Sequence, residues 1–372
     1  MKNIFKVLAI FAIIGTIVII GCKEDDPPPP PPIAISMNKN ALGLIKGKYE
    51  TETLTATVTN TANTAVTWVS SLPSVATVNN GVVTAIAYGT TVITATTVDG
   101  GKTADCTVTV IEEIEMVKIT AGNFTMGQTN VATPTHSVTL TNDFYMGKYE
   151  VTQEQYLAVM GSNPSNFTAA VTGESGTPGK LPVERVSWYD AIVFCNKLSM
   201  MEGLTPAYSI NSKTNPVDWG TVPTSSDATW DAVVIVDGST GYRLPTEAQW
   251  EYACRAGTTT LYNTNKGAID TNTGWYKSNS ESKTHEVGKK SANAWKLYDM
   301  HGNVWEWCWD LYGSYSSEAQ TNPLGASSGT LRVRRGGSWF DSADTGNLRS
   351  ASRDFGYPTH RYTGLGFRLV RP

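Results

Sequence analysis

The sequence predicts an all-β sandwich followed by a larger α+β domain with much irregular structure. Residues 33–111 alternate between apolar and polar side chains in short runs separated by turn sequences. Residues 112–372 contain ten of the eleven tryptophans but only three credible helices. A chain of 372 residues is long enough for two or three domains.

The all-β prediction for residues 33–111 depends on runs, each about as long as a strand, in which apolar and polar residues alternate. Apolar residues two positions apart occur at Leu54, Ala56 and Val58, at Ile93 and Ala95, and at Cys106, Val108 and Val110. Asn80-Gly81 and Asp99-Gly100-Gly101 are sequences that favour tight turns between paired strands. The segment is therefore expected to form antiparallel hairpins.

Three helices are expected in residues 112–372. The first spans residues 152–160 and has Thr152 as its N-cap. The second spans residues 187–198, and the third spans residues 245–254 with Thr246 as its cap. The remaining backbone is irregular, so it needs many side-chain hydrogen bonds or a bound cation.

Residues 1–21 are expected to be a removable signal peptide. Lys2 and Lys6 precede a short apolar stretch that ends in Ile19-Ile20-Gly21-Cys22, which resembles a bacterial lipobox. The resemblance implies lipidation of Cys22, a membrane anchor, and an outer-membrane or cell-surface location. Residues 22–32 include six prolines and predict a stiff spacer. The alternative is an ordinary secretory signal with a chance cysteine.

Composition excludes several classes of function. The formal net charge is −4 and no basic block is present, which argues against a nucleic-acid partner. The four histidines lie far apart, so a zinc or iron centre built on them is not expected. Cys106, Cys195, Cys254 and Cys308 are expected to be buried free thiols, with a disulfide among the last three left open.

The first domain resembles the bacterial Ig-like group 2 family. The resemblance is carried by WVSSLPSVATV at residues 68–78 and by GVVTAIAYGTT at residues 81–91. It implies a spacer role for residues 33–111, with adhesion as the less common role.

The second domain resembles the formylglycine-generating-enzyme, or sulfatase-modifying-factor, family. Matching motifs occur in family order at residues 117–127, 148–152, 181–188, 242–252, 302–307, 335–339 and 366–368. The resemblance implies a C-type-lectin-like fold for residues 112–372.

The same resemblance argues against catalysis. The family's oxidase binds copper through two cysteines that follow Gly-Gly-Ser, and Asp341 and Gly346 occupy those positions here. A carboxylate and a glycine cannot form a thiolate copper site. The family's iron-dependent enzymes need a separate histidine-bearing domain, whereas residues 33–111 contain no histidine. Neither copper nor iron is therefore expected, and an oxidase acting on protein cysteine remains the alternative.

The resemblance also implies a structural calcium ion. Asp299 and Glu306 would supply side-chain oxygens, and Gly302 and Val304 would supply carbonyl oxygens. The alternative is that Asp299 and Glu306 only accept hydrogen bonds from nearby backbone N–H groups.

Residues 340–364 have an unusual composition. They contain no Lys, Glu, Gln, Met or Trp. These are the five amino acids that cannot be encoded when only the two adenines of an Asn codon are mutated. This pattern, together with the flanking motifs, resembles the variable proteins of diversity-generating retroelements. The resemblance implies a surface whose residues vary to bind a ligand, which is expected to be a protein or a glycan on another cell or surface. The rival hypothesis is a structural envelope scaffold without variation.

The variable and constant positions can be assigned separately. The candidate ligand-binding positions are Phe340, Asp341, Ser342, Asp344, Asp354, Phe355, Gly356, Tyr357, Thr359, His360, Tyr362, Thr363 and Gly364. The constant framework comprises Gly336, Gly337, Ser338, Trp339, Leu348, Arg349, Ser350, Arg353, Pro358, Arg361, Leu365, Gly366, Phe367 and Arg368, and residues 345–347 are unassigned. Residues 340–342, 354–357 and 359–364 are expected to share one exposed face above buried Trp339, Leu348, Leu365 and Phe367.

Overall fold

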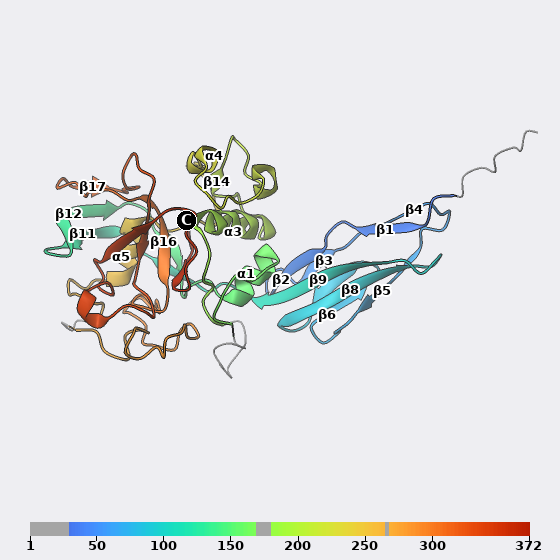
Figure 1. The fold of residues 1–372 in the computed structure, drawn as a ribbon, viewed down its shortest axis with the longest axis horizontal. Helices are drawn as coiled ribbons and strands as arrows, with labels where there is room; N and C mark the ends of the chain where they lie inside the picture. The colour runs from blue at the N-terminus through green and yellow to red at the C-terminus, as the bar shows by residue number, and fades with distance from the viewer. Residues whose placement is uncertain (1–29, 169–179, 265–267) are drawn as a thin grey trace, which may run out of the picture.

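A computed structural model describes residues 30–168, 180–264 and 268–372. It shows an elongated all-β domain attached to a larger mixed domain (Figure 1). The predicted signal peptide and Cys22 lie outside the described residues. Within the described ranges, no helix has the length and apolar character needed to cross a membrane.

The first domain is a sandwich of short sheets. Its strands are β1 (Ala34–Met37), β2 (Ala41–Lys46), β3 (Thr51–Thr53), β4 (Ala56–Thr59), β5 (Val66–Ser70), β6 (Ala76–Asn79), β7 (Val82–Ala85), β8 (Gly89–Thr97) and β9 (Thr103–Glu112). The largest sheet has the order β2-β9-β8-β5, and β3-β7-β6 forms a second sheet. Ile93, Ala95, Cys106, Val108 and Val110 are fully buried, which confirms the predicted alternation.

Both predicted turns join neighbouring strands. Asn80 and Gly81 have φ values of 49° and 82° between β6 and β7, in the region that the residues of a two-residue hairpin turn adopt. Gly100 and Gly101 have φ values of 73° and 58° between β8 and β9.

The second domain has several small sheets and much irregular backbone. Its strands are β10 (Met116–Ile119), β11 (Gly122–Gln128), β12 (Ala132–Leu140), β13 (Phe144–Gly147), β14 (Tyr208–Ser209), β15 (Val234–Ile235), β16 (Trp305–Leu311), β17 (Gln320–Thr321), β18 (Arg332–Arg335), β19 (Arg353–Gly356), β20 (Leu365–Gly366) and β21 (Val370–Arg371). The sheet with the order β19-β18-β16-β20 brings the last forty residues against β16.

The three predicted helices are confirmed. They are α1 (Gln153–Met160), α3 (Trp188–Met201) and α5 (Glu247–Arg255), and each begins with a capping box on Thr152, Ser187 or Thr246. Short helical turns η1 (Pro216–Trp219), α4 (Ala228–Asp231) and η2 (Ala343–Thr345) complete the domain. The four described cysteines are buried and free, as expected.

The two domains are tightly joined. Ile45 and Ile111, at the ends of β2 and β9, belong to the hydrophobic core of the second domain. The Lys48 ammonium lies 2.7 Å from a carboxylate oxygen of Glu202, whose side chain is fully buried. The Tyr49 hydroxyl donates to the Glu202 carbonyl at 2.6 Å. The first domain therefore contributes to the core of the second.

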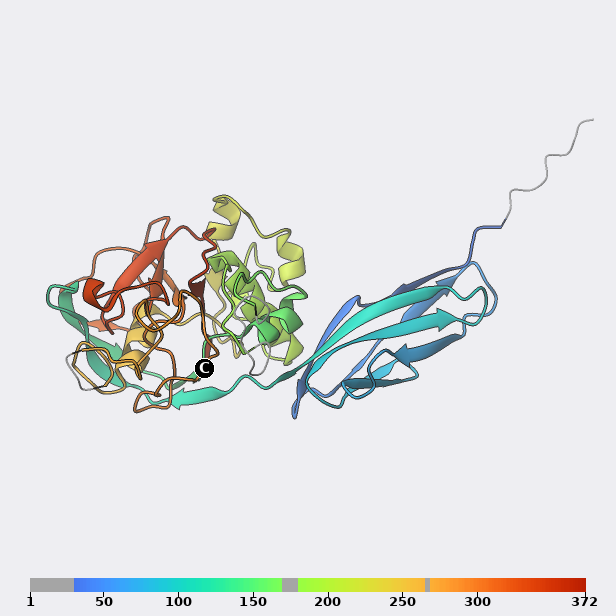
Figure 2. The same ribbon diagram turned by 60° about the horizontal axis from the view of Figure 1, so that its bottom comes forward.

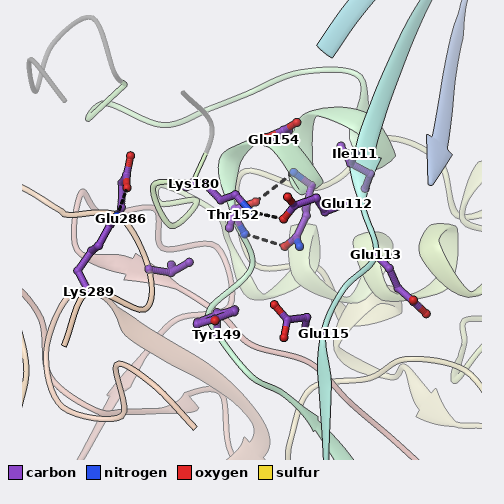
Figure 3. A pocket seen from close by; sticks show the side chains of 12 residues that line it. Ile111, Glu112, Glu113, Glu115, Tyr149, Thr152, Glu154, Lys180, Glu286 and Lys289 are labelled. Carbon is purple, nitrogen blue, oxygen red and sulfur yellow. Dashed lines mark hydrogen bonds and ion pairs between the residues drawn. The ribbon is translucent and has the colours of Figure 1, made fainter. Parts of the chain in front are cut away.

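Beside this junction lies a cavity of about 220 Å³ (Figure 3). It is lined by acidic and basic side chains from the end of β9 and the segment after it, from the start of α1 and from two loops, including Glu112, Glu154, Lys180 and Lys289. Lys180 forms an ion pair with Glu112, and Lys289 pairs with Glu286 at 2.9 Å. None of the candidate ligand-binding positions lines this cavity.

Candidate ligand-binding face and cation site

The candidate ligand-binding positions differ in exposure. Phe340, Asp344, Phe355, Tyr357 and Tyr362 are exposed, whereas Asp341, Ser342, Asp354, Thr359, His360, Thr363 and Gly364 are half-buried. The exposed fractions of the four aromatic residues are 64% for Phe340, 51% for Tyr357, 47% for Tyr362 and 42% for Phe355. Large aromatic side chains that expose this much area are typical of contact surfaces.

Ring contacts connect the exposed tyrosines. His360 lies between them, with its ring centroid 5.2 Å from that of Tyr357 and 5.0 Å from that of Tyr362. The Tyr362 hydroxyl and His360 Nδ1 are 3.1 Å apart. Burial and the nearby charge of Arg334 lower the pKa of His360. The ring at the centre of this group therefore stays neutral at neutral pH.

Arg334, on β18, connects this group of rings to Asp354 and Trp305. Its guanidinium donates twice to Asp354, at 3.1 Å and 2.7 Å, and lies 5.7 Å from the centre of the Tyr362 ring. It also lies 5.4 Å from the centre of the Trp305 ring. Arg334 and Trp305 were not among the predicted site residues, because both lie outside residues 340–364.

Asp341 has a structural role. One of its carboxylate oxygens accepts hydrogen bonds from the Ser338 backbone and hydroxyl and from Trp305 Nε1, at 2.9, 2.8 and 3.0 Å. The other oxygen accepts from Asn347 Nδ2 at 2.7 Å. Both oxygens are therefore used inside the protein, and the carboxylate fixes the turn after β18.

Gly356 does not fit the prediction of an exposed variable position. It is buried, and a Cβ added there would lie 2.9 Å from Trp307 Cη2 and 3.1 Å from His360 Nδ1. Any side chain would have to displace these rings, so only glycine fits at position 356 without a rearrangement.

Phe355 does not share the face with its neighbours. Side chains alternate along a strand, and on β19 Asp354 is directed toward Arg334. Phe355 points the other way and packs on Tyr312, with the ring centroids 4.6 Å apart. We define the candidate binding face as Tyr357, His360 and Tyr362, with Arg334 and Asp354 beneath them, and Phe340 beside Trp339 at the edge.

The predicted core below the face is largely confirmed. Leu348, Leu365 and Phe367 are fully buried, whereas Trp339 is only half-buried. The Trp339 ring contacts Phe340 and Phe167 at 5.5 and 5.3 Å, and its Nε1 donates to the Thr363 carbonyl at 2.9 Å. Trp339 therefore forms part of the edge of the face. Framework arginines bond backbone carbonyls as expected, for example Arg353 to Gly313 and Arg368 to Gly147.

The predicted calcium residues lie in a buried acidic cluster. Glu150, Asp299 and Glu306 are all at most 2% exposed. Asp299 Oδ2 accepts from the Gly288 N–H at 2.7 Å, whereas its buried Oδ1 has no hydrogen-bond partner among the described residues. Burial together with the charges of Asp299 and Glu306 raises the pKa of Glu150. Such an excess of buried negative charge fits a cation.

The carboxylate oxygens of Glu306 already accept hydrogen bonds. Arg368 donates to both of its oxygens, at 2.6 and 2.7 Å, and Trp250 Nε1 donates to Oε2 at 2.7 Å. Oε1 accepts one of these bonds and keeps a lone pair for a cation. In the described parts of the chain, no three His, Cys, Asp or Glu side chains are arranged to hold a metal ion. Calcium would therefore need the Gly302 and Val304 carbonyls, and it stays a prediction.

The resemblance aligns Asp341 and Gly346 with the oxidase's cysteines, and neither residue carries a thiol. Asp341 is engaged as described, and Gly346 has a φ of 76° and would place a Cβ 3.0 Å from the Arg349 guanidinium carbon. Burial raises the pKa of the Cys195 and Cys308 thiols above the usual value, and that of Cys254 to about 12. These three thiols are therefore protonated at neutral pH.

Comparison with known proteins supports the domain resemblances. Residues 105–372 match the model of the sulfatase-modifying factor enzyme 1-like domain, and residues 33–108 match the bacterial Ig-like domain (group 2). The chain is 39% identical over 230 residues to chaperone protein LppX of Paenibacillus barcinonensis, covering 57% of this chain and 74% of that protein. It is 30% identical over 302 residues to the mouse (Mus musculus) formylglycine-generating enzyme, covering 69% and 74% of the two chains.

The solved structures include a similar variable protein. Variable protein 1 of Treponema denticola is 40% identical with a TM-score of 0.62, covering 74% of this chain and 98% of that one. CarF is 26% identical with a TM-score of 0.52, covering 70% and 99% of the two chains. These matches confirm the C-type-lectin-like fold and the resemblance to variable proteins. The chain belongs to the formylglycine-generating-enzyme, or sulfatase-modifying-factor, family, with a bacterial Ig-like domain at its N-terminal side.

Proposed function

We propose that this chain is a membrane-anchored lipoprotein that binds a ligand through its candidate binding face and does not catalyse a reaction. The observation that carries the proposal is the exposure of Phe340, Tyr357 and Tyr362 above a fully buried core. Exposed side chains can change with little effect on folding, whereas buried ones cannot. A face built in this way can vary in sequence while the domain keeps its structure.

The similarity to a variable protein supports this role, because it covers nearly all of that protein. The occupied carboxylate of Asp341 and the restricted backbone at Gly346 support the absence of thiolate copper chemistry. The ligand is a protein or a glycan on another cell or surface, and the anchor is the lipidated Cys22 at the outer membrane or cell surface.

A binding experiment with paired variants tests the proposal. Tyr357→Ala combined with Tyr362→Ala removes two exposed rings from the face, and we expect binding of the purified protein to target cells to fall at least tenfold. The matched control is Tyr88→Ala, which removes a ring that is 50% exposed on the Ig-like domain. Both proteins should keep the wild-type melting temperature. Unchanged binding by the double variant would reject the face as the contact surface.

The scaffold hypothesis makes a different prediction about natural sequences. Variation among isolates of one strain should be concentrated at Phe340, Tyr357, His360 and Tyr362 if the face binds variable ligands. A structural scaffold would show the same residues at these positions in every isolate.

A further inference from the structure

We propose that Arg185 is a ligand-binding residue adjoining the candidate binding face, and that the ligand is a protein that presents an Asp or Glu side chain to it. This contact rests on the proposed function, because it belongs to the same face and names the chemical class of the ligand. Arg185 lies outside residues 340–364, so it is not one of the candidate variable positions. It would supply a contact that stays the same while the other contacts vary.

Arg185 differs from the other arginines in its exposure. The structure describes all eleven arginines of the chain, and Arg185 is the only one of them that is exposed. Among the described residues, its guanidinium takes part in no hydrogen bond and no ion pair. A guanidinium carries five N–H donors in a planar fork, and this fork matches the two oxygens of a carboxylate. The donors of Arg185 can therefore bind a group outside the protein.

The backbone of Arg185 is in the left-handed region, with a φ of 61°. Gly, Asn and Asp adopt this conformation more readily than residues with long side chains. In the described ranges, seven of the thirteen non-glycine residues with positive φ are Asn or Asp, so the protein mostly places short side chains at this geometry. Residues held in such conformations are concentrated at functional sites. The fold itself therefore does not require the long, charged side chain at position 185.

Backbone hydrogen bonds fix Arg185 beside Tyr362. The Arg185 N–H donates to the Tyr362 carbonyl at 3.0 Å, and the Trp188 N–H donates to the Pro358 carbonyl at 3.0 Å. These bonds align residues 185–188 with the segment that carries the exposed tyrosines. Because the acceptors are backbone carbonyls, a change of side chain at position 362 leaves the bond to Arg185 intact. The cation therefore keeps its place beside the face when the face varies.

The neighbouring carboxylates do not bind Arg185. The adjacent Glu184 is fully buried, and its Oε1 accepts from the Phe167 N–H at 2.7 Å. Its Oε2 is buried without a hydrogen-bond partner among the described residues, so Arg185 does not reach it. On the face itself, Asp354 is paired with Arg334 at 2.7 Å. A carboxylate from a ligand would therefore meet a guanidinium that has its donors unused.

The side chains around Arg185 favour a protein ligand. Tyr357 and Tyr362 are exposed, and half-buried Trp339 donates through Nε1 to the carbonyl of Thr363, directly after Tyr362. Tyr, Trp and Arg are the residues most enriched among those that contribute strongly to protein–protein binding. Hydrogen bonds from a guanidinium to an ionised acceptor are stronger than those to a neutral one. An Asp or Glu side chain is therefore the expected partner of Arg185.

Selection from a phage-displayed library of random peptides tests this contact. The purified wild-type protein and the Arg185→Asn variant are immobilised separately, and the phage that each protein retains are sequenced. Asn removes the guanidinium and suits the left-handed backbone, so the variant should keep the wild-type melting temperature. Arg185→Lys keeps the positive charge but lacks the planar fork.

We expect the wild-type protein to enrich peptides that contain Asp or Glu, and Arg185→Asn to bind these peptides about tenfold more weakly, as is typical for the loss of a strong contact residue. Arg185→Lys should recover only part of this binding. The matched control is Lys102→Asn, which removes an exposed cation in the turn between β8 and β9. The Ig-like domain, in blue and cyan, extends away from the red segments that carry the face, so the control should bind like the wild type (Figure 2).

Two results would overturn the assignment of Arg185. One is full binding of the selected peptides by Arg185→Asn, and the other is a wild-type selection without enrichment of acidic peptides. The double variant Tyr357→Ala and Tyr362→Ala keeps this test separate from the proposed function. If the double variant loses the peptides while Arg185→Asn retains them, the face is the contact surface and Arg185 is not part of it.

Treatment of target cells tests the class of the ligand. Protease digestion of the cell surface should abolish binding of the wild-type protein, whereas periodate oxidation of the surface glycans should leave binding unchanged. The reverse result would reject a protein ligand in favour of an acidic glycan. Absence of wild-type binding to untreated cells would instead count against the proposed function, so the two proposals fail separately.

Discussion

Arg368 and Glu306 form an ion pair in which both side chains are completely buried, with Arg368 Nε 2.6 Å from Glu306 Oε2. The same guanidinium also donates to the carbonyls of Gly147 and Tyr298. One framework residue thus connects β13, the loop before Asp299 and β16. This pair links the last motif of the chain to the acidic cluster.

Replacing Arg368 with Met should lower the free energy of unfolding by about 3–5 kcal/mol, because Glu306 would remain as a buried charge without its partner. Chemical denaturation measures this loss. The control is Lys118→Met, which removes the exposed pair with Asp143 and should leave stability nearly unchanged. Equal effects of the two substitutions would show that Arg368 is not the main counter-charge of the cluster.

Calcium should raise the melting temperature relative to the protein in excess EDTA, because a bound cation stabilises the folded state. Terbium provides a direct readout, since the Trp250 indole bonded to Glu306 can sensitise its luminescence. Asp299→Ala should abolish both signals, whereas Asp143→Ala, at an exposed carboxylate, should retain them. If the melting temperature is the same with calcium and with EDTA, the calcium prediction fails.

The stability of the protein should depend on pH through Asp310. Burial, together with the charge of Glu247, raises the pKa of Asp310 to about 7. The folded state therefore holds a proton that the unfolded chain releases near pH 4, so this group lowers stability as pH rises from about 4 to 7. The slope is about 1.4 kcal/mol per pH unit for one group.

Asp310→Asn should remove this part of the pH dependence. The amide oxygen can still accept the hydrogen bond from the Glu247 N–H, which lies 2.8 Å from the native carboxylate. We expect the variant to gain stability relative to the wild type at pH 8 and to lose that advantage at pH 4. Parallel stability curves for the two proteins across this range would contradict the assignment.

Cys22→Ala should release the protein from the membrane fraction and abolish its labelling with fatty acid. The reason is that acyl chains on this thiol would supply the apolar area that holds the chain to a bilayer. Cys106→Ala, at a buried thiol, is the matched control and should remain membrane-bound. A membrane-bound Cys22→Ala protein would exclude the lipoprotein assignment.

The purified protein should neither bind copper(I) tightly nor convert a cysteine-containing peptide to the formylglycine aldehyde. The two positions that need thiolates hold Asp341 and Gly346. Mass spectrometry of the peptide after incubation with copper-loaded protein measures the product, and an active member of the family serves as the positive control. Formation of the aldehyde would restore the oxidase alternative.

The features that the sequence predicts well are those determined by neighbouring residues. The predicted caps Thr152 and Thr246 bond to backbone groups three positions ahead, so their role can be recognised from a few residues. The alternation around Ile93 and Cys106 likewise reflects the two faces of a single strand.

The features that the sequence does not reveal depend on distant partners. Asp341 is fixed by Trp305, and Gly356 is confined by Trp307, and neither contact follows from local pattern. Lys48 and Glu202 meet across 154 positions, so the docking of the two domains could not be anticipated. The direction of Phe355 could have been inferred if Arg353–Gly356 had been recognised as a strand, because side chains alternate.

The rings around Gly356 have a consequence for protein engineering. A combinatorial library built on this scaffold would lose most of its folded members if codon 356 were randomised, because nearly every new side chain would collide with Trp307. Holding Asp341 and Gly356 constant, and diversifying Phe340, Tyr357, His360 and Tyr362, concentrates the screened clones on surfaces that can fold. The same steric limit reduces the number of different sequences that can fold with a functional binding face, whatever process generates the sequence diversity.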